Sequence, residues 1–329
     1  MFKTSLTALA ALSLGFSAFA AGLTGEIKAD GSSTVFPITQ AVADAFREEN
    51  KDVRISVGSS GTGGGFKKFC VGETDISNAS RPIKGKELME AGRNNVKFVE
   101  LPVAYDGLSI VVNKENTWAK QITVDELKAI FTAESKVKTW KDVNPAYPDV
   151  AIKLFGPGTD SGTFDYFKEE VLGKEGAVRK DMSASEDDNA LVKGVEGDKG
   201  GIGFFGYAYF VANKDKLNVL SVVNPKTNEV IAPTPTTIEN GTYAPFSRPL
   251  FIYVNKSSLD KPEIAAFAKF YIENAGELAE KVGYVRLPKA VYATAERNLR
   301  EKKLGTQFFN DVMNEAKQAK KGNLVELYK

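Results

Sequence analysis

The stretch Val53-Arg54-Ile55-Ser56-Val57-Gly58-Ser59-Ser60-Gly61-Thr62-Gly63-Gly64-Gly65 joins an alternating apolar strand to a loop of Gly, Ser and Thr that opens a helix. A second loop of this kind, Gly156-Pro157-Gly158-Thr159-Asp160-Ser161-Gly162-Thr163, follows the apolar segment 150–155. Such loops present free backbone N–H groups and hydroxyls at a helix N-terminus, where the helix dipole favours an anion. The two loops together predict one oxyanion held between two lobes.

A third run, Asp30-Gly31-Ser32-Ser33-Thr34-Val35-Phe36-Pro37, repeats this composition nearer the N-terminus. Glycine and serine also dominate ordinary turns, so either of the first two loops taken alone could be a flexible connection. Three hydroxyl-rich clusters favour a binding pocket.

The composition argues against several kinds of site. The chain contains no His, which removes His-based zinc sites, Ser-His-Asp triads and His general bases. Neither glycine loop is followed by the Lys and Ser/Thr pair of a phosphate-loop nucleotide site. The single Cys70 cannot form an intramolecular disulfide, and we expect it to be a buried, inert thiol. We therefore expect no catalytic residue, no metal and no other cofactor.

Residues 1–20 are typical of a secretory signal peptide, with Lys3, an apolar stretch and an Ala18-Phe19-Ala20 ending. No later segment reaches the roughly 18 uninterrupted apolar residues of a membrane span. One of the 43 Lys and Arg residues lies in 1–20, and the other 42 match the 42 Asp and Glu residues. This balance gives no reason to expect nucleic acid or a membrane surface as a partner. We expect an exported, soluble protein whose partner is a small molecule or another protein.

Strand-like and helix-like patterns alternate along the chain, which favours an α/β fold with mostly parallel sheets. The apolar run 103–112, interrupted by Asp106 and Gly107, and the strand 250–254 are expected to cross between the lobes. These crossings predict a discontinuous lobe I, residues 21–105 plus 250–329, and a lobe II of residues 106–249.

Helix starts and helix lengths can also be predicted. Thr123 with Glu126 forms a capping box, and Ile122 with Leu127 forms a hydrophobic staple, so a helix is expected to begin there. Apolar spacing predicts helices over 262–280 and 289–320.

Four motifs occur together in this chain: GSSTVFP at 31–37, GSSGTGGGFKKF at 58–69, SNASRPI at 77–83 and GTDSGTFDYF at 158–167. In this order they resemble the periplasmic phosphate-binding proteins of ABC phosphate-uptake systems, the PstS family. The resemblance covers most of the mature chain and implies a type II periplasmic binding fold, with two lobes, two crossing strands and phosphate in the cleft. It also implies a periplasmic monomer that delivers phosphate to the permease subunits of an ABC transporter.

The resemblance further implies phosphate ligands in all three loops. They are Ser33, Thr34 and Val35 in the loop 30–37, Ser59 in the loop 58–65, and Ser161, Gly162 and Thr163 in the loop 156–163.

Two positions depart from the family pattern. Well-known relatives have an Arg four residues before the Ser of the Ser-Gly-Thr motif, where this chain has Pro157, and an Asp where this chain has Arg81. We therefore predict that Arg81 is the cationic ligand; the alternative is a surface Arg before Pro82.

The displaced Asp matters because a carboxylate can accept the proton of hydrogen phosphate and repel sulfate. Asp160, beside the ligand serine, and Asp106, in the first crossing strand, are the candidate acceptors. Asp160 could instead cap a helix, and Asp106 could belong to a turn before Gly107.

Three other functions stay open at this point. The first is a carrier of sulfate, molybdate or tungstate. The second is an exported phosphatase or other hydrolase that uses Ser59 or Ser161, although the sequence offers no evident base. The third is an adhesion or matrix protein that keeps the binding fold. The role of the C-terminal tail, 292–329, is also open.

Overall fold

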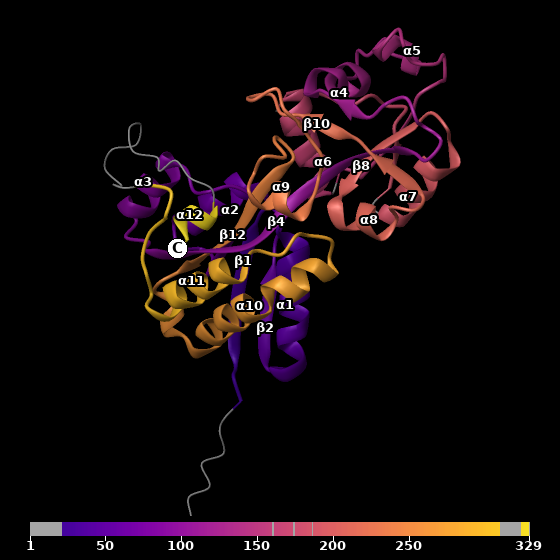
Figure 1. Ribbon diagram of the computed structural model, residues 1–329. Coiled ribbons are helices and arrows are strands. Elements are labelled where there is room, and N and C mark those ends of the chain that lie inside the picture. Colours follow the sequence, from indigo (N-terminus) through magenta and orange to yellow (C-terminus); the bar gives the residue numbers. More distant parts are fainter. Residues whose placement is uncertain (1–21, 160, 174, 186, 310–323, 329) are drawn as a thin grey trace, which may run out of the picture.

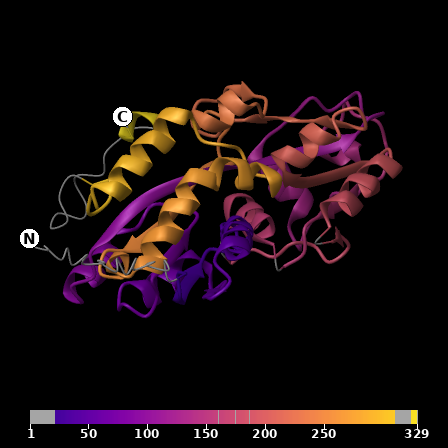
Figure 2. The ribbon, with the colours of Figure 1, turned by 90° about the horizontal axis from the view of Figure 1, so that it is seen from below.

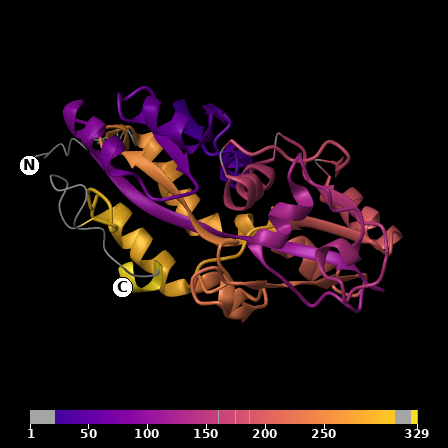
Figure 3. The same ribbon diagram turned by 90° about the horizontal axis from the view of Figure 1, so that it is seen from above.

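A computed structural model describes residues 22–159, 161–173, 175–185, 187–309 and 324–328 (Figure 1). The expected signal peptide and Asp160 lie outside these residues. The described chain forms two α/β lobes, and β4 runs from one lobe into the other (Figure 2, Figure 3). The expected α/β class is confirmed. None of the helices in the described ranges is long and apolar enough to cross a membrane.

The first lobe is built on a sheet with the strand order β2-β1-β3-β12-β4. β1 is parallel to β2 and to β3, whereas β12 runs antiparallel to β3 and to β4. The strands are β1 (Gly25–Gly31), β2 (Val53–Val57), β3 (Ile76–Ala79), β4 (Phe98–Asn113) and β12 (Ser247–Asn255).

Helices cover both faces of this sheet. Successive residues of a strand point to opposite faces, so neighbouring residues of one strand contact different helices. In β12, Ile252 packs in the cluster that holds α1 and α10, and the next residue, Tyr253, packs against Phe66 of α2 on the other face. The helices of this lobe are α1 (Phe36–Glu49), α2 (Gly61–Phe69), α3 (Gly85–Arg93), α10 (Pro262–Lys281), α11 (Lys289–Arg300) and α12 (Leu324–Leu327), with a 3-10 turn at Ser258–Asp260.

The second lobe continues the sheet from the far half of β4 in the order β4-β8-β6-β7, and β9 also pairs with β4. The other strands of this part of the sheet are β6 (Lys153–Gly156), β7 (Ser183–Ala184), β8 (Gly201–Gly206) and β9 (Leu217–Val219). A separate small sheet has the order β11-β10-β5, and its strands are β11 (Val230–Ile231), β10 (Ser221–Val223) and β5 (Gln121–Ile122). The helices of the second lobe are α4 (Val124–Phe131), α5 (Trp140–Val143), α6 (Gly162–Phe167) with a π-helical turn at Lys168–Leu172, α7 (Asp188–Gly197), α8 (Tyr207–Ala212) and α9 (Pro235–Glu239).

The crossing strands are longer than the sequence predicted. All 16 residues of β4 are buried, and β12 pairs with the first part of β4 from Ser247 opposite Gly107 to Asn255 opposite Phe98. The lobe boundaries that we predict, 105/106 and 249/250, fall inside these two strands. Asp106 therefore lies in a strand, and the alternative of a turn before Gly107 is wrong.

The helix predictions were correct in the middle of the chain and partly wrong near its C-terminus. The capping box holds α4 as expected, because Glu126 N–H donates to Thr123 Oγ1 and Thr123 N–H donates to Glu126 Oε2. α11, however, ends at Arg300, so the helix predicted through residue 320 is wrong over 301–309; residues 310–320 lie outside the described ranges. Lys302 has φ 48°, and the N–H of Lys303 donates to Asn298 O, which closes the helix with a Schellman motif.

A buried carboxylate fixes the C-terminal segment. Glu100 of β4 is 2% exposed and accepts hydrogen bonds from Tyr253 OH, Tyr328 OH, Thr306 Oγ1 and the N–H of Gln307. Burial raises its pKa, and these four bonds lower it in part. Glu100 therefore ties the chain after α11 and the segment of α12 to the central strand of the molecule.

Replacing Glu100 by Ala should lower the free energy of unfolding by at least about 3 kcal/mol, because several buried donors lose their acceptor at once. Chemical denaturation monitored by circular dichroism measures this loss. Glu73→Ala, at an exposed position of the same lobe, is the control and should leave stability unchanged. Equal stability of the Glu100 and Glu73 variants would contradict the assigned role.

Candidate functional site

The three hydroxyl-rich loops meet at one cleft between the lobes. A cavity of about 780 Å³ is lined by Ser33 from the loop before α1, by Ser59 and Gly61 at the start of α2, and by Ser161 and Thr163 at the start of α6. Loops that are far apart in the sequence and belong to different lobes thus share one space. This is the arrangement that the sequence predicted for an oxyanion.

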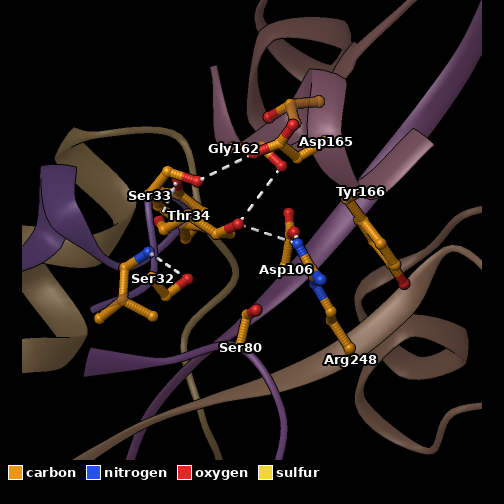
Figure 4. Close-up of polar contacts among 12 residues, drawn as sticks. Ser32, Ser33, Thr34, Ser80, Asp106, Gly162, Asp165, Tyr166 and Arg248 are labelled. Carbon is orange, nitrogen blue, oxygen red and sulfur yellow. Dashed lines mark hydrogen bonds and ion pairs between the residues drawn. The ribbon is translucent and has the colours of Figure 1, made fainter. Parts of the chain in front are cut away.

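The loop between β1 and α1 carries Ser33, Thr34 and Val35. Ser33 Oγ donates to Asp165 Oδ2 of α6 at 3.4 Å, and Thr34 Oγ1 donates to Gly162 O at 3.3 Å. Tyr284 OH donates to Thr34 O at 2.6 Å from the chain that follows α10. The loop is therefore held from both lobes (Figure 4).

The loop before α6 ends with Ser161, the N-cap of that helix. Ser161 Oγ accepts a hydrogen bond from Thr163 N–H at 3.1 Å. The next residue is a glycine because of the opposite lobe: a Cβ on Gly162 would lie 2.4 Å from the backbone N and Cα of Thr34. The two lobes touch here through main-chain atoms.

An arginine that the sequence reasoning missed lies beside this contact. Arg248 of β12 donates from Nη2 to Thr34 Oγ1 at 2.9 Å and from Nε to Asp106 Oδ2 at 3.2 Å. Its guanidinium carbon lies 3.5 Å from the ring centroid of Tyr166. Figure 4 shows Arg248 directed at Thr34, with Asp106 beside it. The side chain of Arg248 is only 17% exposed, so its charge acts in a largely water-excluded place.

Asp106 is the buried counter-charge of Arg248. It is 2% exposed and lines the large cavity. Burial raises the pKa of Asp106, and the charge of Arg248 offsets part of this rise. The role of Asp106 as a proton acceptor stays a prediction.

Arg81 lies near the cleft but its charge already has a partner. Its two terminal nitrogens bind the carboxylate of Glu87 at 2.9 and 2.7 Å, and its guanidinium lies over the ring of Phe66. With Thr34 and Arg248, Arg81 lines a second cavity of about 530 Å³ that adjoins the first. Its role as the cationic ligand stays a prediction, and Arg248 is a second candidate.

The other predicted residues can be placed as follows. Ser33, Ser59, Ser161, Gly162, Thr163 and Asp106 line the large cavity, and Thr34 lines the smaller one. Val35 is fully buried, and its N–H donates to Ser32 Oγ at 3.4 Å. Asp160 lies outside the described residues. Within the described ranges, no group of three or more acids and Cys could hold a metal ion.

Comparison with known proteins gives consistent matches. The family pattern of the PBP superfamily domain matches residues 18–275. Protein SphX of Synechococcus elongatus is 49% identical over 284 residues, 86% of this chain and 83% of that protein. The phosphate-binding protein PstS of Staphylococcus saprophyticus is 45% identical over 278 residues, 84% of each chain.

A solved structure extends these matches to three dimensions. The crystal structure of a possible phosphate binding protein from Planctomyces limnophilus has a TM-score of 0.82 and 47% sequence identity, over 86% of this chain and 100% of that one.

The contact between Gly162 and Thr34 can be tested directly. Gly162→Ala should destabilise the arrangement in which the two lobes touch by about 1 to 3 kcal/mol, because the added methyl group overlaps main-chain atoms of Thr34. Small-angle X-ray scattering should then show a larger radius of gyration. Gly63→Ala, where a Cβ would meet nothing within 4 Å, is the control. Identical scattering of the two variants would rule out this contact as the limit on closure.

Proposed function

Because the chain belongs to the PBP superfamily and, within it, to the family of phosphate-binding proteins that includes PstS and SphX, we propose that it binds inorganic phosphate and delivers it to an ABC importer. One observation carries this proposal: three hydroxyl-rich loops from both lobes line one cleft beside a largely buried arginine. Phosphate is small, anionic and rich in acceptor oxygens, which matches a site built mainly of donors.

In this proposal each loop gives donors to different oxygens of one anion. Ser33, Thr34 and Ser59 bind the anion from the first lobe, and the N–H of Val35 joins them only if it leaves its bond to Ser32 Oγ. Ser161, Gly162 and Thr163 serve from the second lobe. An anion held by both lobes favours their approach, because only the closed arrangement satisfies all of its oxygens.

Arg248 supplies the positive charge. Asp106 and Tyr166 fix its guanidinium from two sides, so little side-chain entropy is lost when an anion takes its free N–H groups. Arg81 is the alternative cation. Each arginine is paired with a carboxylate, but Glu87 binds both terminal nitrogens of Arg81, whereas Asp106 binds Arg248 through Nε. For this reason we place Arg248 first.

The proposed activity is transport, without a chemical step on the ligand. The chain has no His, and Ser161 Oγ, one of the two candidate nucleophiles, accepts a hydrogen bond as a helix cap. We therefore infer that the protein releases no phosphate from esters. It should act as a monomer in the periplasm, after export directed by residues 1–20, and dock on the permease subunits of the transporter.

Isothermal titration of the mature protein, freed of anions by unfolding and refolding, should show one phosphate bound per chain. Arg248→Met should weaken binding by about 2 to 3 kcal/mol, roughly a hundredfold in Kd, because a charged hydrogen-bond partner is lost. Arg93→Met, at an exposed position of α3, should bind as the wild type does. If Arg81→Met lost affinity while Arg248→Met kept it, Arg81 would be the cationic ligand.

Asp106 should exclude sulfate, because its carboxylate accepts the proton that phosphate carries and sulfate lacks. Asp106→Asn should therefore let excess sulfate compete with phosphate, whereas Asp125→Asn, at an exposed position of α4, should not. Because burial raises the pKa of Asp106, the wild type should lose this selectivity as the pH falls through that raised value, above the usual 3.8. Unchanged competition by sulfate in Asp106→Asn would assign the acceptor role elsewhere.

A further inference from the structure

An ion pair lies directly behind the loop that carries Ser59. Asp30, at the end of β1, accepts a bond from Lys68 Nζ at 2.6 Å and a short one from Ser60 Oγ. Ser60 is the N-cap residue of α2, and Lys68 reaches back from the last turn of the same helix. One carboxylate therefore binds both ends of α2.

The backbone of the loop fits closely around this carboxylate. A Cβ on Gly58 would lie 2.4 Å from Asp30 Oδ2, so the loop passes Asp30 with bare main chain. Gly58 N–H donates to Ala29 O at 2.8 Å, and Ser60 N–H donates to Gly31 O at 3.0 Å. Ser59, between these two anchored residues, is exposed and lines the large cavity. Its position depends on the anchors on either side.

Asp30 carries a full negative charge near the cleft. Burial acts to raise its pKa, but the bonds from Lys68 and Ser60 outweigh burial, and the pKa of Asp30 lies below its ordinary value. A carboxylate close to a site for an anion would repel that anion, and the side chain of Asp30 is only 14% exposed, which limits screening by water. Lys68 is the cation that cancels this charge.

We propose that Asp30 and Lys68 are positioning residues of the phosphate site: Asp30 fixes the Gly58–Gly61 loop through Ser60, and Lys68 neutralises Asp30 so that it does not repel the anion. This inference rests on the proposed function. Neither residue lines either cavity at the cleft. Removing Lys68 leaves a negative charge near the site, whereas removing the charge of Asp30 leaves a positive one. The two changes should therefore have opposite effects on phosphate affinity, which would not be expected of a salt bridge that only stabilises the fold.

The test is a set of phosphate titrations on the full mature chain. Lys68→Met should weaken phosphate binding about tenfold or more, because Asp30 is left unneutralised. Asp30→Asn keeps an oxygen for Ser60 and removes the charge, so its affinity should equal or exceed that of the wild type. The double variant should recover the affinity that Lys68→Met loses. Melting curves confirm that each variant is folded at the temperature of the titration.

The outcomes separate the two proposals. If the wild type binds no phosphate, the proposed function fails. If the wild type binds phosphate and Lys68→Met binds equally well, the charge-neutralising role is wrong. If each single variant weakens binding and the double variant is at least as weak, the pair is only structural and the inference is overturned. Recovery in the double variant, together with a steeper gain in affinity with added salt for Lys68→Met than for the wild type, supports the proposal.

Discussion

The pairing of Arg248 with Asp106 is the interaction on which the proposed site depends. The two residues lie directly opposite each other in the antiparallel ladder of β12 and β4, the two strands that connect the lobes. Each would be costly to bury alone, since an unpaired charge in the interior loses its hydration without compensation. Paired in register, they hold the guanidinium of Arg248 beside Thr34, where the lobes meet. The register of β12 against β4 therefore also determines where this ion pair lies in the cleft.

Much of the fold could be predicted, because local rules and tertiary packing agree over most of the chain. The capping box at Thr123 and Glu126 stabilises the helix that it predicts. The end of α11 could not be predicted in this way. A Schellman motif usually has Gly at the position that needs positive φ, and here that residue is Lys302, followed by Gly305 with φ 89°. Apolar spacing continues past the true end, so the periodicity alone extended the helix too far.

The site was predictable where its residues are adjacent in the sequence. The three loops carry their hydroxyls and glycines in short runs, and those runs converge on one cavity. Arg248 and Asp106 are 142 positions apart, and only the register of two strands brings them together. The sequence offered an Arg before an apolar strand and an Asp within one, with no local sign that they pair. Arg81 was predicted to be the cationic ligand from its place in a motif, but it forms an ion pair with Glu87, six residues later.

The contact of Gly162 with Thr34 also limits how narrow the cleft can become. Side chains at a rim change rotamers and let an opening vary, but the peptide backbone of a helix start and of a strand-to-helix loop has no such freedom. Where two main chains meet, the lobes cannot come closer at that point. The width of the cleft therefore has a lower limit at this point, and rotation of side chains alone cannot narrow it further for a smaller ligand.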